Sequence, residues 1–226
     1  MTLTHGLKVI GNGEMIMKTI RPRKSWKINP QVVTVWDNFF TDEYLDILRN
    51  RVLYAKHFDE EYRDYYAIDY FKNQDYLSEI IAKELSSKVD LPPFQRAWSF
   101  LYHSHEREGV GLHSDPSTVN LNIWVSTDKV IKDKSKNGLN IYKVRPPKTW
   151  TSDDWNGDSA KSLRYVKSKK IKPTIVPYKS NRAIFFDGAY FHASNGISTK
   201  EGFENKRVSY TMLFGEPDWI WTGRKK

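Results

Sequence analysis

Apolar residues recur at helical spacing in two segments of the chain before residue 92. The first segment predicts a helix over 42–54, with Thr41 as its N-cap and acidic residues in its first turn. The second predicts a helix over 74–89, which ends ahead of Pro92 and Pro93. The positions expected to face the core are Tyr44, Leu45, Leu48 and Val52 in the first helix and Leu77, Ile80, Ile81 and Leu85 in the second.

The pattern changes after residue 95, where short runs of aromatic and β-branched residues are separated by turn residues. This pattern predicts an antiparallel β domain of the sandwich or barrel type, flanked by the helices. One further strand is expected earlier, over 32–36, where the sequence is VVTVW. The strands expected in the β domain cover 97–102, 119–125, 139–144, 174–178, 183–186 and 208–214.

The length of the chain fits a single domain. Its 226 residues are 39% hydrophobic, and eight Trp, 13 Tyr and 11 Phe supply bulk for a core. We therefore expect one domain over 1–226, with an N-terminal extension over 1–30 and the β core over 95–215. The polar stretch 146–172 interrupts the β pattern, and we expect an insertion there that contains a short helix.

The net charge of +9 permits an anionic partner, such as nucleic acid or an acidic metabolite. The positive residues lie in local runs at 167–172 and 224–226, and no aromatic stacking platform alternates with them. A solvated surface is therefore the favoured interpretation of the charge, and a nucleic-acid partner is not favoured.

Residue types that the chain lacks exclude several kinds of site. With no cysteine, the protein forms no disulfide, thiolate metal site or cysteine nucleophile. No apolar run reaches membrane-spanning length, and the first residues have neither a long apolar core nor a small-residue cleavage site. A cytoplasmic protein without membrane contact is the expectation.

The segment GLHSDPS places His113 and Asp115 two residues apart, so both side chains point to one side of an extended backbone. Far downstream, His192 follows a strongly apolar predicted strand. Two imidazoles and one carboxylate form the facial triad that leaves positions open on Fe(II). Taken singly, His113 also fits a turn capped by Asp115, and His192 also fits a core histidine bonded to a backbone carbonyl.

A second pair of residues follows the triad, in the segment KRVSYTMLFG. Arg207 and Ser209 are two residues apart and share one face of a predicted strand. A guanidinium can bind a carboxylate through two hydrogen bonds, and a hydroxyl can add a third. The order H-x-D, then H, then R-x-S is more informative than any one of these motifs.

On these motifs the chain resembles the Fe(II)- and 2-oxoglutarate-dependent oxygenases, which are built on the double-stranded β-helix or jelly roll. Within that family it resembles the prolyl-hydroxylase-like branch most. The resemblance extends over roughly residues 32–215. The segments that carry it are VVTVWDNFFTDEYLDILRN, FLYHSHEREGVGLHSD, NLNIWVS, NGLNIY, NRAIFFDGAYFHAS and FENKRVSYTMLFG.

The resemblance implies an enzyme that uses Fe(II), O2 and 2-oxoglutarate as cosubstrate, with ascorbate as a candidate reductant, and that hydroxylates its substrate. A carboxylate at Asp115 favours hydroxylation over halogenation, because a halogenase has a small residue there. The residues expected to bind iron are His113, Asp115 and His192. The residues expected at the cosubstrate are Arg207 and Ser209 on its distal carboxylate, together with Tyr102, Asn122 and Trp124; Asn120 is expected on the same inward face.

Some local alternatives stay open. His103 and His105 form an H-x-H that could compete for the metal, and Trp124 fits plain core packing equally well. Asp187 fits a turn-stabilising carboxylate or a partner that orients an imidazole ligand. Because the gap between His192 and Arg207 is longer than is usual in the family, Arg182 and Lys206 are alternative anchors.

The function also has alternatives. One is a jelly-roll module that binds a metal or ligand without turnover, because a fold does not fix a function. Another is a nucleic-acid-modifying oxygenase, although RVSYTML lacks the second arginine of the nucleic-acid demethylases. The substrate is expected to be a small molecule or a peptide; peptidyl proline, a free amino acid, a sugar-linked metabolite and a lipid-like molecule all stay open.

Overall fold

The computed structural model of the protein describes residues 8–10, 14–16, 20, 28–62, 65–69 and 76–216. The first two residues of the second predicted helix, 74–75, and the positive run at 224–226 lie outside these residues. The elements, in chain order, are β1 (Lys8–Ile10), β2 (Glu14–Ile16), β3 (Thr34–Asp37), α1 (Asp42–Leu53), β4 (Glu60–Glu61), β5 (Tyr65–Asp69), α2 (Tyr76–Ser86), β6 (Phe94–Tyr102), β7 (Glu106–Arg107), β8 (Val119–Trp124), the 3-10 helix η1 (Asp128–Val130), β9 (Leu139–Tyr142), the π-helix η2 (Asp153–Gly157), α3 (Ser159–Ser168), β10 (Thr174–Val176), β11 (Arg182–Phe186), β12 (Phe191–Ser194), β13 (Ile197–Ser198), the 3-10 helix η3 (Phe203–Asn205) and β14 (Val208–Phe214).

Strands from most of the chain build two main sheets. The large sheet has seven strands in the order β3-β11-β8-β14-β6-β5-β4, and every pair in it is antiparallel. The small sheet has three antiparallel strands in the order β10-β9-β12. Because sheet neighbours such as β8, β11 and β14 are distant in sequence, the sheets bring together segments that the sequence keeps apart.

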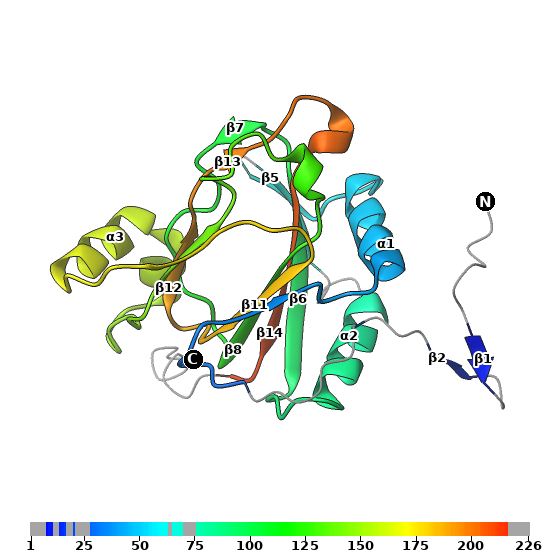
Figure 1. Ribbon diagram of the computed structural model, residues 1–226. Helices are drawn as coiled ribbons and strands as arrows, with labels where there is room; N and C mark the ends of the chain where they lie inside the picture. The colour runs from blue at the N-terminus through cyan, green and yellow to red at the C-terminus, as the bar shows by residue number, and fades with distance from the viewer. Residues whose placement is uncertain are drawn as a thin grey trace.

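The side chains of the large sheet alternate between two faces. On β8, Val119, Leu121 and Ile123 join the main core, which includes residues of α1 and α2. Figure 1 shows both helices on the same side of this sheet. On the other face, Trp124 joins a second cluster with residues of β9, β10 and β11. The space between the two sheets therefore receives the alternate residues of β8.

The first predicted helix is confirmed as α1, and its predicted apolar face is buried. Thr41 caps it as expected, since its hydroxyl oxygen accepts a hydrogen bond from the Tyr44 backbone N–H at 3.3 Å. α2 is also confirmed, but its buried face differs from the prediction. Ser78 is buried while Ile80 is not, because the Ser78 hydroxyl forms a hydrogen bond with the hydroxyl of Tyr210 on β14.

The strand predictions hold best for long apolar runs. β14 has the predicted bounds, whereas β5 and β12 were not predicted. His192 follows the predicted apolar strand, which is β11 and ends at Phe186. It lies within a further strand, β12, which the sequence did not predict. A strand as short as β12 has too few residues to show alternation, and it is defined by its pairing with β9.

The insertion at 146–172 contains η2 and α3, as its composition predicted. Trp155 of η2 and Val166 of α3 are buried in one cluster with Leu112 and Phe191. Figure 1 shows α3 on the opposite side of the molecule from α1 and α2, close to β12. The insertion is thus packed against the two segments that carry His113 and His192. Within the described chain, no helix combines the length and the apolar content that crossing a bilayer requires.

Candidate active site

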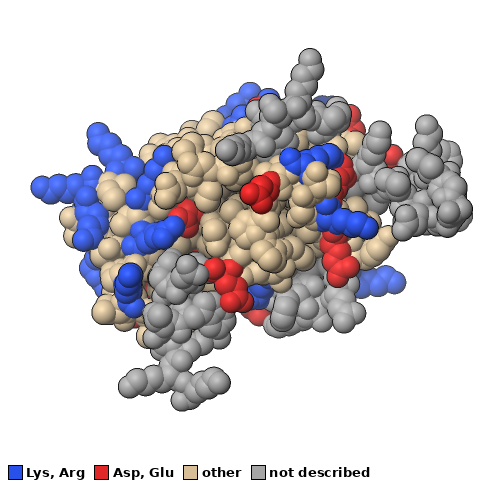
Figure 2. Space-filling view, turned by 90° about the horizontal axis from the view of Figure 1, so that it is seen from below, with Lys and Arg blue, Asp and Glu red and all other residues tan. Residues whose placement is uncertain are grey.

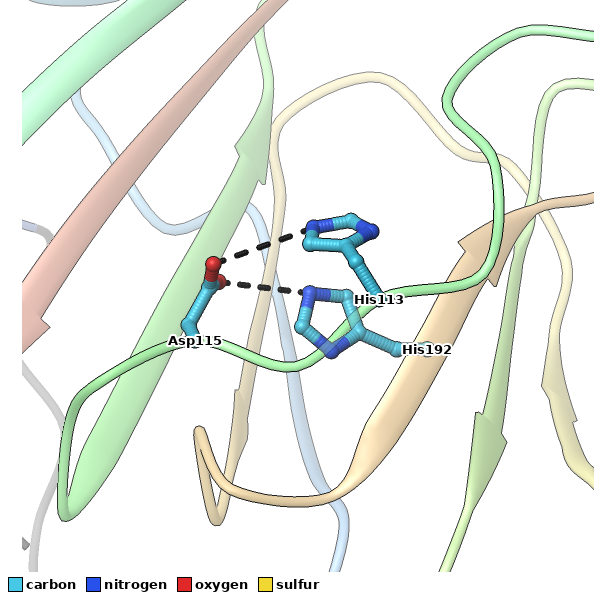
Figure 3. Close-up of side chains that lie close together, drawn as sticks. All are labelled: His113, Asp115 and His192. Atoms are coloured by element: carbon cyan, nitrogen blue, oxygen red, sulfur yellow. Dashed lines mark ion pairs between the residues drawn. The ribbon is translucent and has the colours of Figure 1, made fainter. Parts of the chain in front are cut away.

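The backbones of His113 and His192 are paired as an antiparallel β-bridge. The His113 N–H donates to the His192 carbonyl at 3.0 Å, and the His192 N–H donates to the His113 carbonyl at 2.8 Å. This pairing sets the two imidazoles beside each other, with ring centroids 4.3 Å apart. Figure 3 shows both rings turned toward the carboxylate of Asp115.

Asp115 completes a compact group of three potential metal ligands. Its Oδ1 lies 3.8 Å from His113 Nε2, and its Oδ2 lies 3.3 Å from His192 Nε2. The ligand atoms all lie within 4.8 Å of one another, and no other such group of His, Asp or Glu occurs in the described part of the chain. This spacing allows the three side chains to bind a single ion between them.

The other nitrogen of each imidazole has a backbone partner. His113 Nδ1 lies 2.8 Å from the Gly111 carbonyl, and His192 Nδ1 lies 2.9 Å from the Tyr190 carbonyl. A carbonyl only accepts, so each Nδ1 carries a proton, and Nε2 is the nitrogen of each imidazole that is directed at the centre of the group. Metal-ligating histidines in proteins are oriented in the same way.

The protonation states also suit a cation. Burial, followed by the charge of the neighbouring His192, lowers the pKa of His113 to about 4. Burial by itself would raise the pKa of Asp115, but the two imidazoles and the Asn120 amide outweigh it and lower that pKa below its usual value. At neutral pH His113 is therefore neutral and Asp115 is ionised, which are the forms that bind metal.

A chain of hydrogen bonds along the inner face of the large sheet holds Asp115. The Asn120 amide donates to Asp115 Oδ2, and the Asn122 amide donates to Asn120 Oδ1 at 3.0 Å. The Thr211 hydroxyl donates to Asn122 Oδ1, also at 3.0 Å. These bonds fix the orientation of both amides. The Asp115 carboxylate is therefore held by side chains of β8 and β14.

The loop that carries Asp115 is tied to the turn ahead of β12. The Asp115 N–H donates to the Gly188 carbonyl at 2.8 Å, and the Ser114 hydroxyl donates to the Ala189 carbonyl at 2.9 Å. At Gly188 there is no room for a side chain, because a Cβ would lie 1.9 Å from the Ser117 hydroxyl oxygen. Glycine is therefore required where the two segments meet.

Asp187 stabilises this turn and does not orient an imidazole. Its Oδ1 accepts from the Ala189 N–H at 3.0 Å, and its Oδ2 accepts from Arg145 Nε at 3.0 Å. The His192 Nδ1 proton goes to a backbone carbonyl instead. Of the two roles left open for Asp187, the turn-stabilising one is the one the structure shows.

Arg207 is buried, with 2% of its surface exposed, and is only partly hydrogen bonded. Its Nη2 donates to the Asn137 carbonyl at 3.0 Å, while Nε and Nη1 have no partner. The guanidinium carbon lies 4.8 Å from the Tyr102 ring centre, 5.7 Å from that of Tyr178 and 5.9 Å from that of Trp124. Aromatic faces stabilise the cation, but they leave two N–H groups unpaired.

One pocket between the two sheets contains the triad and Arg207. It brings together every predicted site residue, including the expected neighbours Tyr102, Asn122 and Ser209. The full lining consists of Trp98, Phe100, Tyr102, Val110, His113, Asp115, Asn122, Trp124, Leu139, His192, Ser194, Arg207, Ser209 and Thr211. A buried cation with two free donors fits an anionic guest in this pocket.

The alternative residues lie elsewhere. His103 Nε2 lies 3.2 Å from the Tyr62 carbonyl, and His105 Nδ1 lies 2.9 Å from the Thr199 hydroxyl, so the H-x-H forms no metal site with His113. Arg182 is paired with Asp37 at 2.6 Å and does not line the pocket. Lys206 does not line it either; its ammonium lies 5.3 Å from the ring centre of exposed Phe203.

Sequence reasoning missed three contributors. Asn120 was placed on the inward face but was not linked to Asp115, although the spacing of Asn120 and Asn122 could have indicated a polar chain. Thr211 follows Ser209 on the same face of β14, and Arg207 directly precedes this strand, so period-two alternation could also have found Thr211. No sequence signal points to Tyr178, which stacks on Trp124 with ring centroids 5.0 Å apart.

No protein-family model matches the chain, and no curated protein matches its sequence. Solved structures match its fold. HygX from Streptomyces hygroscopicus with nickel and 2-oxoglutarate bound is 12% identical, with a TM-score of 0.52 over 82% of this chain and 83% of that one. The epimerase SnoN, in complex with Fe3+, alpha ketoglutarate and nogalamycin RO, is 11% identical, with a TM-score of 0.56 over 85% of this chain and 87% of that one. The match confirms the predicted jelly-roll fold, the double-stranded β-helix.

Proposed function

We propose that this protein is a non-haem Fe(II)- and 2-oxoglutarate-dependent oxygenase that hydroxylates its substrate. One observation carries the proposal. A His-Asp-His group with its ligand atoms directed inward shares a buried pocket with an arginine that has two nitrogens without a hydrogen-bond partner. A metal-binding jelly roll needs only the first feature. The second feature calls for an anion in the same pocket.

Fe(II) fits the three donors. Two imidazoles and one carboxylate are the ligand set that leaves positions free on iron for a chelating cosubstrate and O2. His113, Asp115 and His192 would hold the ion, and the Asn120 amide would hold Asp115. The carboxylate at Asp115 favours hydroxylation over halogenation.

The side chains in the rest of the pocket suit the chemistry of 2-oxoglutarate. Its keto acid end would bind the metal, and its distal carboxylate would accept hydrogen bonds from the Arg207 guanidinium, which has nitrogens without a partner, and from the Ser209 hydroxyl. Tyr102 and Trp124 flank the guanidinium and keep water from this end. Asn122 lines the pocket between the two ends and would contact the cosubstrate.

When bound, Fe(II) supplies the oxidising chemistry with O2 and 2-oxoglutarate, and the protein supplies position and a dry pocket. The overall reaction gives succinate, CO2 and a hydroxylated substrate, and succinate and the product each take one oxygen atom of O2. Arg207 and Ser209 orient the cosubstrate, while the bond from Asn120 keeps Asp115 in place through turnover.

We infer that the substrate is a small molecule or a peptide. HygX is also solved with hygromycin B bound, and SnoN with nogalamycin RO, so this fold accommodates small-molecule ligands in other proteins. The prolyl-hydroxylase-like branch, which the sequence resembles most, is part of the proposal and keeps peptidyl substrates open.

The test has two measurements on the full-length protein. Calorimetry with Mn(II) in place of iron is expected to show 2-oxoglutarate binding that depends on the metal. Succinate release with Fe(II), ascorbate and 2-oxoglutarate, across a panel of candidate substrates, is expected for the parent and not for His192→Ala. If 2-oxoglutarate does not bind in the presence of metal, the protein is a jelly-roll binding module and the oxygenase proposal is wrong.

A further inference from the structure

A larger cavity of about 490 Å³ opens outward from the metal ligands, and His113 and Asp115 form part of its lining. One part of the lining, the first wall, comes from β5, β6, β4 and the residue after β4; another part, the second or facing wall, comes from η2 and the start of α3. The two walls differ in chemistry: aromatic rings line the first, and small polar groups line the second. We call this cavity the outer basin.

The aromatic wall consists of Tyr62, Tyr65, Trp98 and Phe100. Tyr65 is central: its ring lies 4.8 Å from Tyr62 at an interplanar angle of 26° and 4.5 Å from Phe100 at 48°. Trp98 and Phe100 are 6.4 Å apart and inclined at 40°. Neighbouring rings of this wall are inclined to one another by 26 to 48° and do not share one plane.

These rings are on the inward face of the sheet and stay partly exposed. On β6, Ala97 and Leu101 join the main core, while Trp98 and Phe100 point into the basin. A side chain of this size is normally covered when it faces the inside of a jelly roll. Concave, partly exposed aromatic surface next to a candidate metal site is typical of a ligand pocket.

Trp98 requires a ligand that carries a hydrogen-bond acceptor. Its indole Nε1 is buried and has no hydrogen-bond partner. The indole N–H is only a donor, so the partner that satisfies it must carry an acceptor such as a hydroxyl or ether oxygen. Trp98 lines both the basin and the inner pocket, so that oxygen would lie close to the place where the substrate meets the metal.

The facing wall offers hydrogen bonds without net charge. Asn156, Gly157 and Ser159 line it, and all three are exposed. The charged residues of the basin, apart from Asp115, are Glu60 and Arg96, one of each sign. Both have contacts within the aromatic wall: Glu60 accepts from the Tyr62 hydroxyl, and the Arg96 guanidinium lies 5.4 Å from the Trp98 ring centre.

Positive charge gathers on α3 and just after it, at residues that do not line the basin. Figure 2 shows Lys and Arg side chains clustered at the left edge, the side on which Figure 1 places α3. The exposed basic residues there include Arg164, Lys167, Lys169 and Lys170, whereas no lysine is among the described residues of the basin lining. The basin itself therefore does not favour a polyanion.

We propose that the outer basin binds a glycosyl ring, so that the substrate is a sugar or a glycoside. This substrate class rests on the proposed oxygenase function. A pyranose has an apolar C–H face, which packs on the negative faces of aromatic rings, and a rim of hydroxyls. The C–H face fits the aromatic wall, and the hydroxyls reach Trp98 Nε1, Asn156 and Ser159. A planar aromatic ligand would instead pack between parallel rings, and the rings that line this basin are inclined to one another.

The proposal is tested by saturation-transfer NMR on the full-length protein, with and without Mn(II) and 2-oxoglutarate. The probes are methyl α-D-glucopyranoside and methyl β-D-galactopyranoside, with indole and quinoline as planar aromatic competitors. At least one glycoside is expected to bind through the C–H groups of one face. Trp98→Phe keeps the ring but loses the N–H, so the affinity is expected to fall about three- to tenfold. Tyr76→Ala, at an aromatic residue on α2 that is 68% exposed, is the matched control and should bind as the parent does.

Three outcomes contradict the proposal: no glycoside binds, indole or quinoline binds more tightly than either glycoside, or Trp98→Phe binds as tightly as Tyr76→Ala. Calorimetry of 2-oxoglutarate on the same samples separates this result from the proposed function. If 2-oxoglutarate binds and the glycosides do not, the substrate class alone is wrong. If the glycosides bind and 2-oxoglutarate does not, the ring site stands and the oxygenase proposal is wrong.

Discussion

The guanidinium carbon of Arg207 lies 4.8 Å from the centre of the Tyr102 ring. Tyr102 is the last residue of β6, and Arg207 directly precedes β14, the neighbouring strand. The Tyr102 N–H donates to the Arg207 carbonyl at 2.9 Å. The backbone pairing therefore fixes the ring against the cation. Because the ring supplies no hydrogen-bond acceptor, Nε and Nη1 stay free for a guest.

Removing the guanidinium tests this site. Arg207→Ala is expected to weaken 2-oxoglutarate binding by about 2 to 5 kcal/mol, since a buried charged partner is lost. Arg207→Lys should bind more weakly than the parent too, because lysine keeps the charge and loses the two-pronged donor geometry. Calorimetry with Mn(II) measures both, and Arg164→Ala, at an exposed arginine of α3, is the control. An unchanged affinity in Arg207→Ala would show that the anchor is another residue.

Loss of one imidazole tests the metal group. His192→Ala is expected to lower the Mn(II) affinity by more than about 100-fold, since even the loss of a ligand's hydrogen-bonding partner costs 10- to 100-fold. Metal titration followed by electron paramagnetic resonance measures it. His105→Ala is the matched control, because that imidazole lies 2.9 Å from the Thr199 hydroxyl, outside the group. Equal loss in both variants would contradict the assignment.

The hydrogen bond from Asn120 to Asp115 gives a third prediction. Asn120→Leu keeps the approximate volume but removes the donor, so Asp115 loses the partner that orients it. The Mn(II) affinity should fall about 10- to 100-fold while the fold is retained. Asn140→Leu is the control on β9, where the side-chain oxygen has no hydrogen-bond partner to lose. If the two variants bind Mn(II) equally well, Asn120 does not position Asp115.

A side chain at Gly188 is expected to destabilise the fold. In Gly188→Ala the new Cβ would lie 1.9 Å from the Ser117 hydroxyl oxygen and 2.9 Å from the Ser117 carbonyl oxygen, so the backbone of the neighbouring loop with Asp115 must shift. Overpacking of this kind costs about 1 to 3 kcal/mol of unfolding free energy. Gly157→Ala is the matched control, because the nearest atom to its Cβ would be 3.8 Å away. Urea denaturation of the two variants measures the difference, and equal midpoints would refute the prediction.

Acid stability should depend on Asp37. The hydrogen bond from Arg182 is the largest cause that lowers the pKa of Asp37 from 3.8 to about 2; burial opposes it. A carboxyl whose pKa is lower in the folded state stabilises the fold above its unfolded pKa, and this stabilisation is lost as the pH falls through the folded value. Unfolding free energy should therefore decrease between about pH 4 and pH 2.

Thermal unfolding at a series of pH values measures that loss. Asp37→Asn should remove this component, so its stability should change less than that of the parent over the same range. Glu79→Gln, at an exposed carboxylate on α2, should follow the parent. A parallel decline in Asp37→Asn and the parent would show that other carboxyl groups are responsible.

The sequence determined the elements whose signal is local. The N-cap at Thr41 and the buried face of α1 follow from side-chain chemistry within a few residues, and both were predictable. The alternation of side chains along the predicted strand likewise placed Arg207, directly ahead of β14, and Ser209 on one face. The spacing of His113 and Asp115 indicated a shared direction, because period two is a property of any extended backbone.

Only the tertiary structure decided how these pieces meet. β12 is four residues long and exists because β9 pairs with it, so no local pattern could place His192 inside a strand. Long-range contacts also decide that Arg207, and not Arg182, lines the pocket with nitrogens free to bind an anion. Arg182 lies opposite Asp37 and is paired there, whereas Arg207 faces a pocket with two donors free. Sequence spacing gives the direction of a side chain, but its partners are set by strands that are distant in the chain, and those partners decide the chemistry.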